Sequence, residues 1–225
     1  MTKTQTFNLY DQLRFLGFSA EFILREDLVQ LISENQQTSD LFITENFDDT
    51  TELQVLPFFC QSRQKDTYLL QKYQATLHHP TDPKRDKSQL FNLEKGIQIK
   101  LKEAFNLLQG RSVYKEVAPP NGETFNAWIQ LNFREKDATG NFKMVKIRPY
   151  HGYELTNVLK QYPIQELADN DLKEAIIQTL KVGDRKLVTF LKPSGKIEKK
   201  IIEANPAFRT INIYSAVGVA QKESR

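Results

Sequence analysis

The chain has 225 residues, of which 40% are hydrophobic and 11% aromatic, so it holds enough apolar material for a packed core and is not disordered throughout. No apolar run approaches the roughly 20 residues that a membrane-spanning helix needs. The first residues also lack the apolar segment of a secretory signal. The only cysteine, Cys60, excludes an internal disulfide and is typical of a reducing compartment. We therefore expect a cytoplasmic protein without a membrane partner.

The net charge of +3 is unevenly distributed along the chain. Residues 1–99 hold 10 Lys and Arg against 14 Asp and Glu, whereas residues 100–225 hold 21 against 14. A basic C-terminal half favours an anionic partner, either a nucleotide-like small molecule or nucleic acid. The alternative is a solvated lysine-rich surface that has no such partner.

The first hundred residues predict two helices followed by strands. Apolar residues recur at helical spacing over 7–16 and again over 19–34, where Ser19 is a candidate N-cap. Alternating or short apolar runs then predict four strands, at 41–46, 52–60, 67–77 and 88–93. The segment 78–87, which is rich in proline and charge, is typical of a loop.

The middle of the chain predicts a helix and a group of strands. The helix covers 99–109 and ends at a C-terminal cap on Gly110. Strands are predicted at 113–117, 125–133 and 142–147, separated by the turn sequences APPNG and TGN. Within the second strand, Trp128 and Gln130 alternate with the apolar residues and face the opposite side.

The last third predicts helices at 153–161 and 170–180, followed by strands at 185–192, 196–203 and 209–214. This element order repeats that of the first third at an offset of about 143–146 residues, which indicates a duplication. We therefore predict an α+β fold in which two similar helix–helix–β-meander units flank a central helix and antiparallel strands. The predicted boundaries are 1–98, 99–152 and 153–215, with a flexible tail at 216–225.

Basic and aromatic residues are densest between Gly110 and Tyr153, and we predict a ligand site there. Arg111 follows the helix cap, where a guanidinium can hold a phosphate in bidentate fashion. Arg148 lies where the central strands end and a helix begins, so backbone donors would add to its charge. Trp128 offers a stacking surface for a base. The nine candidate ligand-binding residues are Arg111, Tyr114, Lys115, Trp128, Gln130, Arg148, Tyr150, His151 and Tyr153.

Each of these residues also has a structural interpretation. Arg111 is as readily explained by an ion pair with a neighbouring carboxylate, and Trp128 by a place in the core. The pair His78 and His79, with two aspartates after it, resembles a metal site only if the proline-rich loop folds back, so no metal and no cofactor is predicted.

Several motifs resemble a domain-of-unknown-function family encoded on Bacteroidetes conjugative and other mobile elements. The resembling segments cover nearly the whole chain: NLYDQLRFLGF, DTYLLQKYQATL, KLKEAFNLLQGRSVYKEV, NAWIQLNF, HGYEL and EANPAFRTINIY. The resemblance implies a protein of a mobile element or phage, but it brings no settled activity. The chain departs from the family at KIRPYHGY, where relatives have a more polar lead into Gly-Tyr.

No phosphate loop, zinc-binding motif or nucleophile elbow is present, so nothing in the sequence requires an enzyme. We predict a non-enzymatic binding protein that recognises a nucleotide-like anionic ligand and could sequester a defence signalling nucleotide. The alternatives are a protein-interaction module, a hydrolase with His151 as general base, and a DNA- or RNA-binding accessory factor in element transfer. The last would use Lys181, Arg185, Lys186, Lys196, Lys199 and Lys200.

Overall fold

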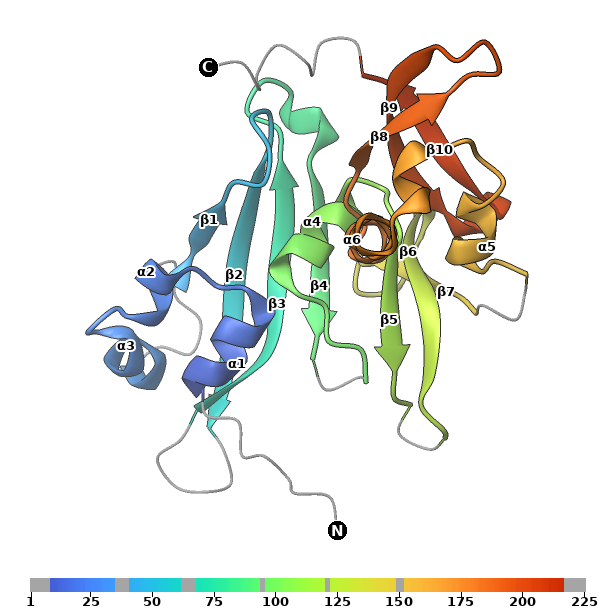
Figure 1. Cartoon of the computed structure of the whole chain (residues 1–225). Coiled ribbons are helices and arrows are strands. Elements are labelled where there is room, and N and C mark those ends of the chain that lie inside the picture. The colour runs from blue at the N-terminus through green and yellow to red at the C-terminus, as the bar shows by residue number, and fades with distance from the viewer. Residues whose placement is uncertain are drawn as a thin grey trace. The chain divides into compact units, whose positions relative to one another are not determined.

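The computed structural model describes residues 9–34, 41–61, 68–93, 96–119, 122–148 and 152–216. Helices hold 29% of the residues and antiparallel sheets 40%, which confirms the predicted α+β class (Figure 1). Contacts within the chain divide it into two compact units. Unit 1 comprises Met1–Gln109, Val117–Thr124 and Phe133–Lys143, and unit 2 comprises Gly110–Glu116, Phe125–Asn132 and Met144–Arg225.

Unit 1 contains an antiparallel sheet with the strand order β1-β2-β3-β4. Its strands are β1 (Ile43–Glu45), β2 (Glu52–Gln61), β3 (Tyr68–His78) and β4 (Lys87–Asn92). Burial alternates along β2 and β3, so that Leu53, Val55, Tyr73 and Ala75 point into the core. Two helices, α1 (Leu9–Leu16) and α4 (Leu101–Leu108), pack against β3, and both lie in front of the sheet in Figure 1.

The helix predicted over 19–34 is interrupted and forms two helices, α2 (Ala20–Ile23) and α3 (Leu28–Glu34). Ser19 caps α2 as predicted, because its hydroxyl accepts a hydrogen bond from the Phe22 amide at 3.4 Å. Phe22 and Ile23 are buried in α2, and Leu28 and Ile32 are buried in α3. One straight helix would spread these four side chains over more than half of its circumference, so the break is what lets all four reach the core.

The turn between β1 and β2 is organised by the carboxylate of Asp48. Its Oδ1 accepts hydrogen bonds from the Thr50 amide at 2.9 Å and from the Thr51 amide at 2.7 Å. Its Oδ2 accepts one from the Gln109 side chain at 3.1 Å, which ties the turn to the end of α4. Burial favours the neutral form of Asp48, but the hydrogen bonds from Thr50 and Thr51 outweigh it and lower the pKa of this carboxyl below its usual 3.8.

We expect Asp48→Ala to lower the free energy of unfolding by about 1–3 kcal/mol at neutral pH, because the buried Thr51 loses its acceptor. Since the folded-state pKa of Asp48 is depressed, its contribution is present above the usual pKa and disappears as the pH falls through the folded-state value. Urea unfolding at several pH values measures this, with Glu26→Ala, at an exposed site in the turn before α3, as control. An effect of equal size at pH 2 and pH 7 would contradict the assignment.

A second sheet has the strand order β5-β6-β7, with β5 (Val113–Val117), β6 (Phe125–Lys136) and β7 (Phe142–Ile147). The turn between β6 and β7 is closed by Asp137, whose Oδ1 accepts hydrogen bonds from the amides of Thr139 at 2.9 Å and Asn141 at 3.0 Å. Gly140 adopts a positive φ of 84° in this turn, which a residue without a side chain does at little cost. The predicted turn at 139–141 is therefore confirmed.

Unit 2 also contains a sheet with the order β10-β9-β8, formed by β8 (Lys186–Leu191), β9 (Ile197–Asn205) and β10 (Thr210–Ser215). Its helices are α5 (Leu155–Leu159) and α6 (Asn170–Lys181), with short 3-10 turns η4 (Gln165–Ala168) and η5 (Pro206–Phe208). One face of the sheet contributes Val188, Ile202 and Ile211 to a core that also holds Leu155 of α5 and Leu180 of α6. No helix in the described part of the chain is long and apolar enough to cross a membrane.

Both compact units contain helices followed by an antiparallel meander, whereas the predicted arrangement of two matching units around a central section stays a prediction. The predicted central section, 99–152, is divided between them: α4 belongs to unit 1, whereas the start of β5 and of β6 belongs to unit 2. The duplication itself stays a prediction. Of the tail at 216–225, only Ala216 lies within the described residues.

Candidate functional site

The aromatic members of the predicted site are part of a core. The side chain of Trp128 is only 1% exposed and belongs to the hydrophobic core of unit 2. The rings of Tyr114 and Tyr153 lie 5.2 and 5.5 Å from it, both at tilted or edge-on angles. Of the two interpretations given for Trp128, the structure supports a core residue, since a ring this deeply buried has no face left on which a base could stack.

Tyr153 is as buried as Trp128, and its phenol is polar. Among the described residues, its hydroxyl oxygen has no partner with full hydrogen-bond geometry, although the Asn205 backbone approaches it. Burial raises the pKa of Tyr153 above its usual range. The phenol therefore stays neutral at physiological pH.

Arg111 lies in an ionic network with carboxylates of its own unit. Its guanidinium is 3.9 Å from Asp184 and 4.0 Å from Glu203, and it donates to the Gly183 carbonyl at 3.5 Å. Glu203 is itself buried and accepts a hydrogen bond from Arg185 at 2.8 Å. The interpretation of Arg111 as an ion-paired residue is the one that this geometry supports.

Two further candidates, Arg148 and Gln130, have contacts within unit 2. Arg148 stacks its guanidinium on the Phe125 ring at 3.8 Å, and Gln130 donates to the Gly110 carbonyl at 3.4 Å. Lys115 is half-buried on β5. Tyr150 and His151 lie outside the described residues. A ligand-binding role for these nine residues stays a prediction, but Arg111, Trp128 and Tyr153 are already engaged in structural contacts.

The basic cluster proposed for nucleic acid is partly neutralised by neighbouring groups. Arg185 pairs with Glu203, and Lys200 pairs with Glu198 at 2.5 Å. Lys199 donates to the Thr189 hydroxyl at 2.7 Å. These contacts reduce the field that a phosphate backbone would experience at this surface.

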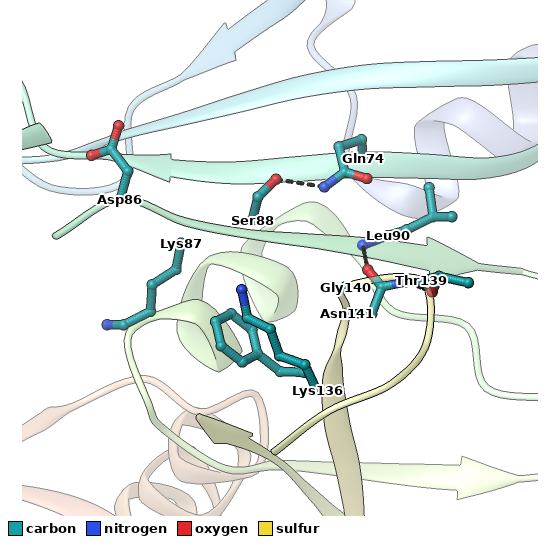
Figure 2. Close-up of a pocket in the computed structure, with 10 residues that line it drawn as sticks. Gln74, Asp86, Lys87, Ser88, Leu90, Lys136, Thr139, Gly140 and Asn141 are labelled. Atoms are coloured by element: carbon teal, nitrogen blue, oxygen red, sulfur yellow. Dashed lines mark hydrogen bonds between the residues drawn. The ribbon is translucent and has the colours of Figure 1, made fainter. Parts of the chain in front are cut away.

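A cavity in unit 1 is lined in part by two lysines. It measures about 320 Å³ and lies where the β6–β7 turn meets β4 (Figure 2). We call it the lysine pocket, and its lining includes Gln74, Asp86, Lys87, Ser88, Lys136 and Asn141. In Figure 2 the side chains of Lys87 and Lys136 lie on one side of the β4 ribbon, whereas the Asp86 carboxylate points to the other side.

Two side-chain amides attach the turn to the edge of β4. Asn141 accepts a hydrogen bond from the Leu90 amide at 2.8 Å, drawn in Figure 2. Gln89 bonds both backbone groups of Phe142, accepting from its amide at 2.8 Å and donating to its carbonyl at 3.4 Å. The turn itself is closed by the hydrogen bonds of Asp137. Lys136, the last residue of β6, therefore lies next to a well-fixed turn that forms one wall of the pocket.

Both lysines of the pocket lie against aromatic rings. The Nζ of Lys87 is 4.5 Å from the centre of the Phe133 ring, and that of Lys136 is 4.9 Å from Phe142. Lys87 also donates to the Leu108 carbonyl at the end of α4, at 3.4 Å. Within the described part of the chain, neither lysine forms an ion pair with a carboxylate.

Lys87 is the more desolvated of the two. Burial, followed by repulsion from Arg85, lowers the pKa of its ammonium below the usual 10.5. A cation that is partly removed from water and has no carboxylate partner is stabilised by any anion that enters the pocket.

Asp86 also lines the pocket, but within the described residues it forms no ion pair with these lysines, and its carboxylate bonds to two histidines instead. Its Oδ2 lies 2.8 Å from His78 Nδ1, and its Oδ1 accepts a hydrogen bond from the His79 amide at 2.7 Å. Burial of Asp86 opposes ionisation, but its bonds to His78 and His79 outweigh this and lower its pKa. These contacts fold the 78–87 loop, which contains the 3-10 turn η2 (Pro83–Arg85), back on itself.

A larger hollow of about 520 Å³ lies at the start of α6, next to Glu166 and Asp169. Both carboxylates already accept backbone hydrogen bonds: Glu166 from the Thr189 amide at 2.9 Å, and Asp169 from the Asp171 amide at 2.8 Å. Their role is to cap the edge of β8 and the N-terminus of α6. The hollow therefore has fewer uncommitted polar groups for a ligand than the lysine pocket has.

Sequence reasoning did not assign the lysine pocket as a site. Its lysines come from two polar segments, PKRDK and REKDATGN, which a sequence marks only as a loop and a turn. One signal was available, because the spacing of Asp137, Thr139 and Asn141 is typical of a turn closed by its own side chains. Comparison of the chain with protein-family models, with curated proteins and with solved structures found no match.

Proposed function

We propose that the protein is a binding protein whose lysine pocket holds a small phosphate-bearing ligand of nucleotide-like size. The observation that carries the proposal is the presence of two lysines, Lys87 and Lys136, in one cavity without a carboxylate partner among the described residues. In most proteins such charges either pair or face open solvent. Lys136 is exposed, whereas the Lys87 ammonium is partly desolvated and still has no carboxylate partner in the described part of the chain.

The size and the lining of the pocket restrict the ligand. A volume of about 320 Å³ is at the lower end of the range for ligand sites, which favours a mononucleotide or a sugar phosphate over a larger molecule. Gln74 and Ser88 add polar groups to the wall, while Phe142 adds an apolar surface. The proposal keeps the predicted ligand class but places it on residues other than the nine predicted ones.

Two charge-assisted contacts to a phosphate contribute about 1.5–3 kcal/mol each. Together they give a dissociation constant between about 10 mM and tens of micromolar. Calorimetric titration of the protein with inorganic phosphate and with AMP at low ionic strength tests this. We expect both to bind at one site, more weakly as salt is added. No heat from either ligand at about 50 mM, several times the weakest expected dissociation constant, would refute the proposal.

A further inference from the structure

Two sheet edges are closed by hydrogen bonds from other segments of their own unit. On β8 the Thr189 amide donates to Glu166 at 2.9 Å, and the Leu191 amide donates to the Pro163 carbonyl at 2.9 Å. On β4 the Leu90 amide donates a hydrogen bond to the Asn141 side chain. Such covering prevents an edge strand from pairing with another chain.

No described segment covers the edge formed by β10 in this way. From Thr210 to Tyr214, the backbone-to-backbone hydrogen bonds of this strand within the described residues run only to β9, and the one side-chain contact to its backbone is local, from the Thr210 hydroxyl to the Ile211 carbonyl at 3.5 Å. The segment TINIYS contains no charge and no proline, the two devices with which natural proteins protect an open edge. Ile213 is 41% exposed and Tyr214 is 37% exposed. β10 therefore presents unpaired backbone groups beside exposed apolar side chains.

We propose that β10 pairs antiparallel with β10 of a second copy of this chain. An uncharged strand can pair with itself without placing like charges opposite each other, which is the requirement of a two-fold interface. A register centred on Asn212 sets Ile211 opposite Ile213 of the second copy, and both lie on the core face of the sheet, where Ile211 is 4% exposed and Ile213 is opposite Ile202. The two three-stranded sheets then form one six-stranded sheet.

Sedimentation velocity across a concentration series tests the proposal. We expect the wild-type protein to form a dimer and Ile213→Lys to weaken dimerisation by roughly tenfold or more, because the charge enters the paired strands. Ile197→Lys alters an isoleucine that is 59% exposed at the start of β9, and the dimer should persist in that variant. A monomeric wild type, or equal dimerisation of Ile213→Lys, would overturn the proposal.

A second measurement uses only the wild-type protein, so its result does not depend on whether Ile213→Lys folds. Amide hydrogen exchange in β10 should slow as the protein concentration rises, while exchange in β8, whose edge is already covered, should not change. A partner peptide of another sequence on the same edge would leave the purified protein monomeric and its exchange independent of concentration. Either result would overturn pairing with a second copy.

Discussion

Replacement of Trp128 by alanine is expected to lower the free energy of unfolding by about 3–5 kcal/mol, because the ring fills the core of unit 2 and its removal leaves a cavity. Trp128 is 1% exposed, and its tilted contact with Tyr114 and edge contact with Tyr153 add to its packing. Urea unfolding followed by circular dichroism measures the loss without relying on the fluorescence of the only tryptophan. Binding of phosphate to the lysine pocket, in unit 1, should be retained wherever the variant is folded.

Tyr153→Phe is the matched control for this experiment. It alters the same core but removes only a hydroxyl whose one polar neighbour among the described residues, the Asn205 backbone, does not reach full hydrogen-bond geometry. Deleting an unsatisfied buried polar group is neutral or stabilising, so the unfolding free energy should stay within about 1 kcal/mol of wild type or rise. If Trp128→Ala were as stable as wild type and bound AMP more weakly, Trp128 would be a ligand platform and not a core residue.

The elements of this fold could be predicted because each leaves a local pattern. The alternation in 125–133 and the cap at Ser19 depend on neighbours in sequence, and both appear as predicted. The break between α2 and α3 was missed because residues 24–27 contain no proline or glycine to mark it. What favours the break is the burial of Phe22 and Leu28 together, and burial depends on contacts that no local window contains.

The candidate site was harder to predict because its chemistry is decided by distant residues. Alternation placed Trp128 on the polar side of its strand, but Leu155, Ile176 and Val188, which come later in the chain, cover that side with a second apolar layer. Arg111 looked like an anion-binding residue until Glu203, some ninety positions later, supplied its counter-charge. Conversely, Lys87 and Lys136 meet in one pocket only because Asn141 attaches the β6–β7 turn to β4.

Lys136→Met should weaken phosphate binding by about 10- to 100-fold while leaving stability almost unchanged. The side chain is exposed and forms no ion pair in the described part of the chain, so its removal costs the fold little, whereas a lost charge-assisted contact is worth about 1.5–3 kcal/mol. Lys143→Met is the matched control, because Lys143 lies outside the pocket and pairs with Glu135 at 2.8 Å. Calorimetry with inorganic phosphate measures both variants.

Lys87→Met tests whether Lys87 serves to bind phosphate or to hold the end of α4. Its ammonium is partly desolvated, so an apolar side chain of similar length should keep or raise the stability of the free protein, apart from the loss of the 3.4 Å bond to Leu108. Phosphate should then no longer raise the melting temperature, because stabilisation by a ligand depends on its affinity for the folded state. A residue kept only to cap α4 would show the reverse: lower stability and unchanged binding. Equal phosphate affinity in wild type, Lys87→Met and Lys136→Met would place any bound anion outside the lysine pocket.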